Sequence, residues 1–199
     1  MKLLLLTVCF CISALCLQAQ QDVISLPAPQ KTGGKPLMEA LNERQSIREY
    51  SGKEIDSQTL SNLLWAANGF NRADKRTAPT ANNRQEMDVY IMLKDGIYLH
   101  DAKDNKLILC AKGNFIASMG KQDFVKTAAV HLIFVANLDK SSSGQIDTGY
   151  ISQNVYLFCA SEGLGTVARG SFDKTLAADM KLADNQKIIL VQPVGVLNK

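Results

Sequence analysis

Three strand-like segments separated by short turns constrain the fold of this chain most. Residues 87–93, 97–102 and 106–111 are rich in apolar, aromatic and β-branched side chains. Asp95-Gly96, a dipeptide typical of tight hairpin turns, separates the first two segments, and residues 103–105 form a second turn. The sequence therefore predicts a three-stranded meander of antiparallel strands.

Helical segments precede this meander. Pro36 suits the first turn of a short helix over residues 37–43, where its missing N–H would have no partner in any case. Asp56 or Ser57 is expected to cap a second helix, which Gly69 ends. The apolar face of that second helix carries Leu60, Leu63, Leu64 and Ala67.

The remainder of the chain predicts further helices and buried strands. The expected elements are a short helix at 122–127, a buried strand at 130–138, a long helix from Asp147 or Thr148 to Gly163, a short strand from Val167, a helix at 173–180 and a buried strand at 187–194. With 199 residues, 46% of them hydrophobic, the chain can bury one sizeable core. We therefore expect the α+β class, with helices around one mostly antiparallel sheet.

The first residues have the pattern of a secretory signal peptide. Lys2 precedes an apolar run to about Leu17, and Ala19 offers a small residue near the exit. The run is too short for a comfortable membrane span. We expect a signal peptide at 1–19, a flexible lead-in rich in Pro and Gly at 20–35, and a folded domain at 36–199.

Export leads to an expected location in the periplasm. Leu15 directly before Cys16 makes a poor lipoprotein signal, so no lipid anchor is expected. After removal of the signal, only Cys110 and Cys159 remain. They are either two buried thiols or one disulfide.

No metal-ligand spacing occurs in the sequence. His100 and His131 stand alone, one in a hairpin and one in a buried strand, and both are interpreted as structural. The net charge of +3 is too small and too scattered to indicate a nucleic-acid partner.

A local cluster of arginines is more informative than the net charge. Arg44, Ser46 and Arg48 occupy alternate positions after the first short helix. In an extended backbone, residues two apart face the same side, so two guanidinium groups and a hydroxyl would converge on one point. Guanidinium forks bind phosphate, which makes the cluster a candidate anion cradle. The alternative is a solvated surface run.

Two further stretches contain candidate ligand contacts. Asn83 and Gln85 carry amide donors and acceptors suited to a planar heterocycle or a polyol, or they form an ordinary polar turn. Gly163, Leu164 and Gly165 follow the long helix. Their backbone N–H groups could approach a ligand closely, or Gly163 is simply a helix cap.

Taken in order, these stretches resemble the nitroreductase family of FMN-dependent oxidoreductases. The resemblance covers about residues 37–196 and rests on R-x-S-x-R, T-A-x-N-x-Q and E-G-L-G. It is closest to short members, some of them similar to azoline-oxidising dehydrogenases. It implies that Arg44, Ser46 and Arg48 hold the phosphate and ribityl end of FMN. Asn83 and Gln85 would then meet polar ring or ribityl atoms, with Gly163, Leu164 and Gly165 near the redox edge.

The resemblance also implies a homodimer with FMN at the interface and a ping-pong cycle. A reduced nicotinamide, NADH or NADPH, would deliver hydride and leave before a small electron acceptor such as a nitroaromatic or a quinone enters. The chain lacks the longer basic tail of many members, so Lys199 or Arg169 would have to complete the phosphate site. Reduced nicotinamides are available in the cytoplasm, so an exported enzyme would lack the electron donor that the resemblance implies. The alternatives are an exported flavin- or peptide-binding module without turnover and an interaction domain without cofactor.

Overall fold

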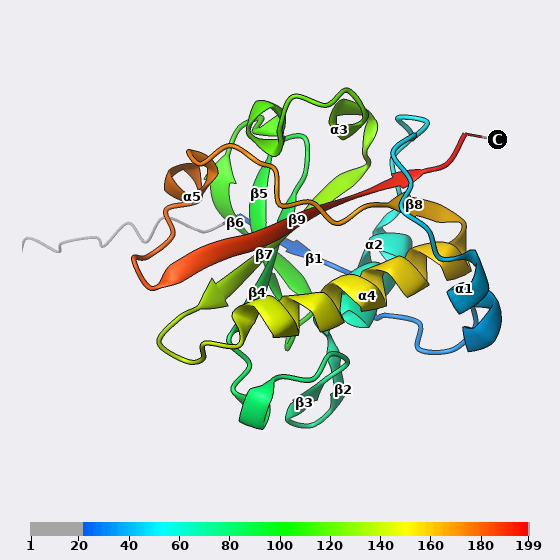
Figure 1. Ribbon diagram of the computed structural model, residues 1–199, viewed down its shortest axis with the longest axis horizontal. Helices are drawn as coiled ribbons and strands as arrows, with labels where there is room; N and C mark the ends of the chain where they lie inside the picture. The colour runs from blue at the N-terminus through cyan, green and yellow to red at the C-terminus, as the bar shows by residue number, and fades with distance from the viewer. Residues whose placement is uncertain (1–21, 199) are drawn as a thin grey trace, which may run out of the picture.

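The computed structural model describes residues 22–198, and a seven-stranded antiparallel sheet forms its centre (Figure 1). The signal peptide expected at 1–19 and Lys199 lie outside the described residues. The strand order is β1-β6-β5-β4-β7-β9-β8, and every neighbouring pair is antiparallel. The strands are β1 (Val23–Ser25), β4 (Met87–Met92), β5 (Gly96–Asp101), β6 (Lys106–Lys112), β7 (Val130–Asn137), β8 (Leu164–Thr166) and β9 (Gln186–Val196). The predicted α+β class with a mostly antiparallel sheet is confirmed.

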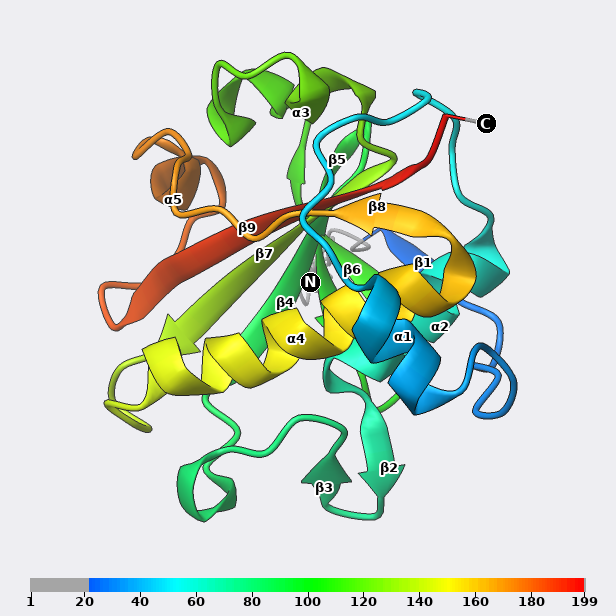
Figure 2. The ribbon, with the colours of Figure 1, turned by 45° about the vertical axis from the view of Figure 1, so that its right-hand side comes forward.

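Helices cover both faces of the sheet. One face packs against α2 (Ser57–Asn68) and α4 (Gly144–Glu162). Helix α1 (Leu37–Glu43) packs on α4, and Figure 2 shows it beside the C-terminal part of α4. The other face is covered by shorter elements: η2 (Ile116–Met119), α3 (Phe124–Thr127) and α5 (Leu176–Asp179).

Strand β7 explains why both faces need a cover. Its side chains alternate between the two cores: Leu132 and Phe134 join the core under α2 and α4, while Ile133 and Val135 join the core under α3 and α5. All four are fully buried. An alternation in which both sets are apolar is the pattern of an interior strand. The apolar residues 132–136 within the predicted strand at 130–138 thus encode the two-layered core.

The predicted meander is confirmed as β4, β5 and β6. Tyr90 pairs with Leu99 across the first turn, and Leu99 pairs with Ile108 across the second. Helix α2 is also confirmed, because the Asp56 carboxylate accepts a hydrogen bond from the Thr59 backbone N–H at 2.6 Å and Gly69 follows the last turn. Local capping chemistry is sufficient to set these boundaries.

Several boundaries differ from those expected. Helix α4 begins at Gly144, before the expected Asp147 or Thr148, because Ser143 starts the helix and Asp147 lies buried in its first turns. The short strand β8 runs over Leu164–Thr166 rather than from Val167, since it begins directly after the left-handed cap residue Gly163. Helix α5 is shorter than the expected 173–180, and β9 extends beyond 187–194 at both ends.

The segment between α2 and β4 contains structure of its own. A two-stranded ribbon forms from β2 (Phe70–Arg72) and β3 (Lys75–Arg76), followed by the short helix η1 (Ala81–Asn83). This ribbon lies at the lower edge of the molecule in Figure 1.

The lead-in expected to be flexible follows a defined path from residue 22. Val23 pairs with Ile108, so β1 is an edge strand beside β6. The Ser61 hydroxyl then donates to the Pro27 carbonyl at 2.6 Å, and the Lys35 N–H donates to Ser161 Oγ at 2.8 Å. These bonds hold the segment across α2 and α4. Within residues 22–198, no helix is long and apolar enough to cross a membrane.

Candidate functional site

Helix α4 gathers two members of the Arg-Ser-Arg segment. Arg44 directly follows α1, and its guanidinium lies over the Tyr156 ring, 5.2 Å from the ring centroid. Ser46 Oγ lies 3.0 Å from Tyr156 Oη. Tyr156 was not among the sequence candidates, because an aromatic residue on an apolar helix gives no sign of a partner so distant in the chain.

Backbone contacts fix this segment against β8. The Ile47 N–H donates to the Thr166 carbonyl at 2.9 Å, and the Tyr50 hydroxyl donates to the Ile47 carbonyl at 2.8 Å. Tyr50 is 5% exposed and packs against Gly195, where a Cβ atom would come within 2.5 Å of the ring. Ile47 is therefore anchored on both sides, which holds Ser46 and its neighbours in register with the sheet.

Three arginines give this region an excess of positive charge. Arg169 is 7% exposed, and its Nη1 donates to the Met119 carbonyl at 2.8 Å. Its Nη2 has no hydrogen-bond partner. Burial lowers the Arg169 pKa, and the nearby positive charge of Arg48 lowers it further. Within residues 22–198, no carboxylate forms a salt bridge with Arg44, Arg48 or Arg169. The region is therefore suited to an anion.

The Glu-Gly-Leu-Gly turn reaches the same region. A cavity of about 470 Å³ is lined in part by Arg44, Gln45, Ile47, Gly163, Leu164 and Leu197. Gly163 has φ of 68° and caps α4, so its left-handed backbone accounts for this glycine. Gly165 is buried, and a Cβ atom there would lie 2.7 Å from Leu197 and 3.0 Å from Ile47. Close packing accounts for the second glycine.

Asn83 and Gln85 lie in a different region of the folded structure from the Arg-Ser-Arg segment. The Gln85 Nε2 donates to the Asp74 carbonyl at 2.8 Å, and the Asn83 Nδ2 donates to the same oxygen at 3.1 Å. Both residues have left-handed backbones, with φ of 55° at Asn83 and 47° at Gln85. Their side chains face the β2–β3 ribbon. Within a single protomer, they do not lie beside the Arg-Ser-Arg segment. Such strained residues cluster at functional sites.

The loop that carries Asn83 and Gln85 is fastened to the start of α4. The Ala81 N–H donates to Asp147 Oδ2 at 3.3 Å, and Arg84 Nη1 donates to the Lys140 carbonyl at 3.0 Å. Asp147 is 2% exposed and Glu86 is 1% exposed. Burial raises the Glu86 pKa, and the neighbouring Asp147 carboxyl raises it further. This buried carboxyl pair also escaped the sequence interpretation.

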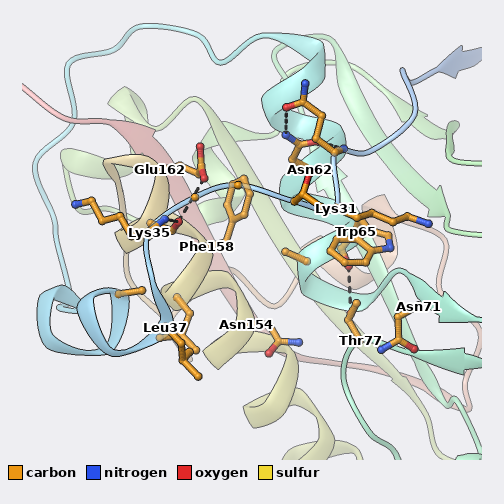
Figure 3. A pocket seen from close by; sticks show the side chains of 18 residues that line it. Lys31, Lys35, Leu37, Asn62, Trp65, Asn71, Thr77, Asn154, Phe158 and Glu162 are labelled. Carbon is orange, nitrogen blue, oxygen red and sulfur yellow. Dashed lines mark hydrogen bonds between the residues drawn. The ribbon is translucent and has the colours of Figure 1, made fainter.

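A second cavity, of about 590 Å³, lies between the lead-in segment, α2 and α4 (Figure 3). Trp65 and Phe158 form part of its wall, and Lys31 Nζ lies 5.7 Å from the Trp65 ring centroid. Lys35 lines both this cavity and the smaller one, so the two are adjacent. None of Arg44, Ser46 and Arg48 lines the larger cavity.

The histidines and cysteines take structural positions. His131 is 1% exposed, its Nε2 lies 3.0 Å from the Val125 carbonyl, and burial lowers its pKa to about 4. Burial also lowers the His100 pKa to about 4. Cys110 and Cys159 are free, so of the two alternatives the structure has thiols rather than a disulfide.

Comparison with known proteins decides the family. The family model described as "Nitroreductase family" matches residues 41–196. The chain belongs to the nitroreductase family. The predicted resemblance is thereby confirmed.

Individual relatives agree with this membership. A Methanocaldococcus jannaschii protein named as a nitroreductase is 29% identical over 182 residues, which cover 80% of this chain and 90% of that protein. A crystal structure of a protein named as a nitroreductase from Ralstonia eutropha JMP134 is 37% identical, with a TM-score of 0.82. It covers 89% of this chain and 90% of its own.

A third comparison bears on the fold alone. A crystal structure from Clostridium acetobutylicum, named as an NADH oxidase, is 23% identical with a TM-score of 0.60. The match covers 80% of this chain and 88% of that chain. As a nitroreductase family member, the protein is an oxidoreductase whose sheet and flanking helices follow the family fold.

Proposed function

We propose that this nitroreductase family member is an FMN-dependent oxidoreductase that passes hydride from a donor to a small acceptor such as a nitroaromatic or a quinone. The observation that carries the proposal is the convergence of Arg44 and Ser46 at Tyr156, with no carboxylate salt bridge to Arg44 within residues 22–198. A phosphate would supply the missing negative charge.

The donor set suits a phosphorylated ligand. The guanidinium of Arg44 can bind phosphate oxygens through a bidentate fork, and the exposed Ser46 hydroxyl adds a neutral donor. Arg48 and the buried Arg169 raise the local positive potential, and Arg169 is therefore a further candidate for the phosphate site. Bound FMN would supply the two-electron chemistry, while the protein holds and orients it. Gly163 and Leu164 remain candidates for contacts at the redox edge.

The separation of the two polar stretches favours a site completed by a second copy. Asn83 and Gln85 lie in the loop that Asp147 holds near the start of α4. Arg44 and Ser46, in contrast, contact Tyr156 in the later turns of α4. With 19 residues, α4 is about 28 Å long. Two α4 helices packed antiparallel across a two-fold axis would bring the loop of one protomer to the arginines of its partner.

Exposed apolar side chains support this packing. On α4, Ile146 and Tyr150 are 64% and 46% exposed. On the adjoining α1, Leu37 and Met38 are 63% and 75% exposed. We name these four residues the α1–α4 face. Ile146 and Tyr150 lie near the start of α4, and α1 lies beside its C-terminal part. Antiparallel packing of two copies would set one exposed apolar pair of each protomer against the other pair of its partner, so a homodimer through this face is the proposed assembly.

The expected export affects the choice of donor. We propose a location outside the cytoplasm, on the strength of Lys2 and the apolar run that follows it. Reduced nicotinamides are the donors that the family implies, and an exported enzyme would need another electron source or would act as an oxidase. The identity of the electron donor is therefore tested separately from FMN binding.

Absorbance spectroscopy of the purified mature protein tests the proposal. FMN titration should give a saturable shift of the flavin spectrum at one FMN per chain. Under anaerobic conditions NADH, NADPH and dithionite are compared as reductants, and a quinone or nitroaromatic should restore the oxidised spectrum. A protein that leaves the flavin spectrum unchanged would contradict FMN dependence. If the protein binds FMN but no acceptor restores the oxidised spectrum of the bound flavin, the protein is the flavin-binding module without turnover instead.

A further inference from the structure

The Tyr156 hydroxyl joins two segments that are far apart in the chain. The Ala168 backbone N–H donates to Tyr156 Oη at 2.9 Å, and Tyr156 Oη lies 3.0 Å from Ser46 Oγ. Tyr156 itself is half-buried on α4, whereas Ser46 is exposed. Three groups therefore form a line from the backbone after β8 to the surface of the candidate anion cradle.

The protons on these groups fix one of the two hydrogen-bond directions. A backbone N–H can only donate, so Tyr156 Oη accepts from Ala168 and keeps its own proton for another partner. Ser46 Oγ is within reach of that proton, and either hydroxyl of this pair can be the donor. When Tyr156 donates to Ser46, the Ser46 proton is free to point outward. A hydroxyl that already accepts a hydrogen bond becomes a better donor, so each bond in the line strengthens the next.

The face of the same ring fixes Arg44. Its guanidinium lies 5.2 Å from the Tyr156 ring centroid, a distance typical of a cation–π contact. One side chain therefore orients two members of the cradle by different means: the ring holds the cation, and the hydroxyl directs the Ser46 proton. Arg48 forms no hydrogen bond or cation–π contact with Tyr156 among the described residues.

We propose that Tyr156 is a positioning residue for the bound anion, acting as the middle of a hydrogen-bond relay from Ala168 N–H through Tyr156 O–H to Ser46 O–H. The proposal rests on the proposed function, because the ligand group that the relay serves is the anionic phosphate of FMN or its neutral, hydroxyl-rich ribityl chain. The relay predicts that the Tyr156 hydroxyl acts on the ligand only through Ser46.

A double-mutant cycle tests this dependence. FMN dissociation constants are measured for the wild type, Y156F, S46A and Y156F/S46A by quenching of flavin fluorescence. The phenylalanine keeps the ring under Arg44 and removes only the hydroxyl. Y98F is the matched control, because Tyr98 Oη also donates a hydrogen bond, at 2.9 Å to Asp95 Oδ2, but lies on strand β5 rather than on α4. Thermal unfolding of each variant separates lost folding from lost binding.

The relay predicts coupled losses. Y156F and S46A should each weaken FMN binding about tenfold, and the double variant should bind no more weakly than S46A alone. Y98F should bind as the wild type does. Wild-type affinity in Y156F, or losses that multiply in the double variant, would overturn the relay while leaving FMN dependence intact. A wild type that binds no FMN would overturn both proposals.

A crystal structure of the wild-type FMN complex gives a readout that needs no variant. Ser46 Oγ should lie within hydrogen-bond distance of both Tyr156 Oη and an FMN oxygen. A Ser46 rotamer turned away from Tyr156, or an FMN oxygen bound to Tyr156 Oη itself, would overturn the relay.

Discussion

Asp147 in the first turns of α4 lies beside the buried Glu86 carboxyl and raises its pKa further than burial alone does. Asp147 also accepts a hydrogen bond from the Ala81 N–H. The buried pair therefore joins the start of β4, the start of α4 and the loop that carries Asn83 and Gln85. Two charges in such a site would repel each other, so Glu86 keeps its proton more readily than an exposed glutamate.

This relationship predicts how stability depends on pH. The folded protein retains the Glu86 proton at pH values where the unfolded chain, with a glutamate pKa of 4.5, has lost it. The contribution of Glu86 to stability therefore falls as pH rises from 4.5 to the folded pKa, by about 1.4 kcal/mol for each pH unit between the two. Glu86→Gln should flatten this fall, measured by urea unfolding at a series of pH values.

A surface carboxylate provides the control for this series. Glu54 is exposed, and the hydrogen bond from Lys94 lowers its pKa, so Glu54→Gln should leave the fall above pH 4.5 unchanged. Parallel curves for Glu86→Gln and the wild type would show that the Glu86 carboxyl does not carry the effect.

Gly195→Ala should destabilise the fold by about 1–3 kcal/mol, because the added Cβ would lie 2.5 Å from the Tyr50 ring in a packed core. Chemical denaturation gives the free energy of unfolding. Gly149→Ala is the contrasting variant: a Cβ at this helical position meets nothing within 4 Å and should stabilise α4 by about 0.5–1 kcal/mol. Equal effects of the two substitutions would contradict the packing explanation.

Ile146→Asp should convert the proposed dimer into a monomer and weaken FMN binding together with it. The carboxylate would be buried in the α1–α4 face, whereas near the start of α4 it is compatible with a folded helix. Light scattering coupled to size exclusion measures the mass. Leu138→Asp, at a residue that is 48% exposed beyond the end of β7, should remain dimeric. A monomeric wild type would contradict the assembly directly.

Arg44→Ala should weaken FMN binding about tenfold or more, because a charge-assisted contact to phosphate is lost. Riboflavin, which lacks the phosphate, should bind the variant and the wild type alike. Arg72→Ala removes an equal charge from an arginine whose Nε donates to Asn71 Oδ1, and should leave FMN affinity unchanged. Equal losses for FMN and riboflavin would place Arg44 away from the phosphate.

The elements that were predicted well depend on local chemistry. Helix α2 has a capping aspartate and a terminal glycine within its own sequence, and the β4–β5–β6 meander has turn residues between its strands. Strand β8 was misplaced because its boundary depends on pairing with β9, where Gly165 faces Gly195. The edge strand β1 was missed because its partner, β6, is remote in sequence.

The same distinction applies to the candidate site. The types and spacing of Arg44 and Ser46 could be read directly from the chain. The Tyr156 contact could not, since it depends on how α4 crosses the segment after α1. The Glu86–Asp147 pair could not be read from the sequence either, because aspartate and glutamate usually lie at the surface of a protein.

The pairing of β1 with β6 has a consequence for folding. The amino end of the domain is synthesised first, yet its hydrogen-bonding partner is synthesised much later, so this border of the sheet stays open until the meander has formed. An open border invites pairing with other chains, and the short β1 closes it. Removing the chain as far as Ser25 is then expected to promote aggregation before it weakens binding at the candidate site.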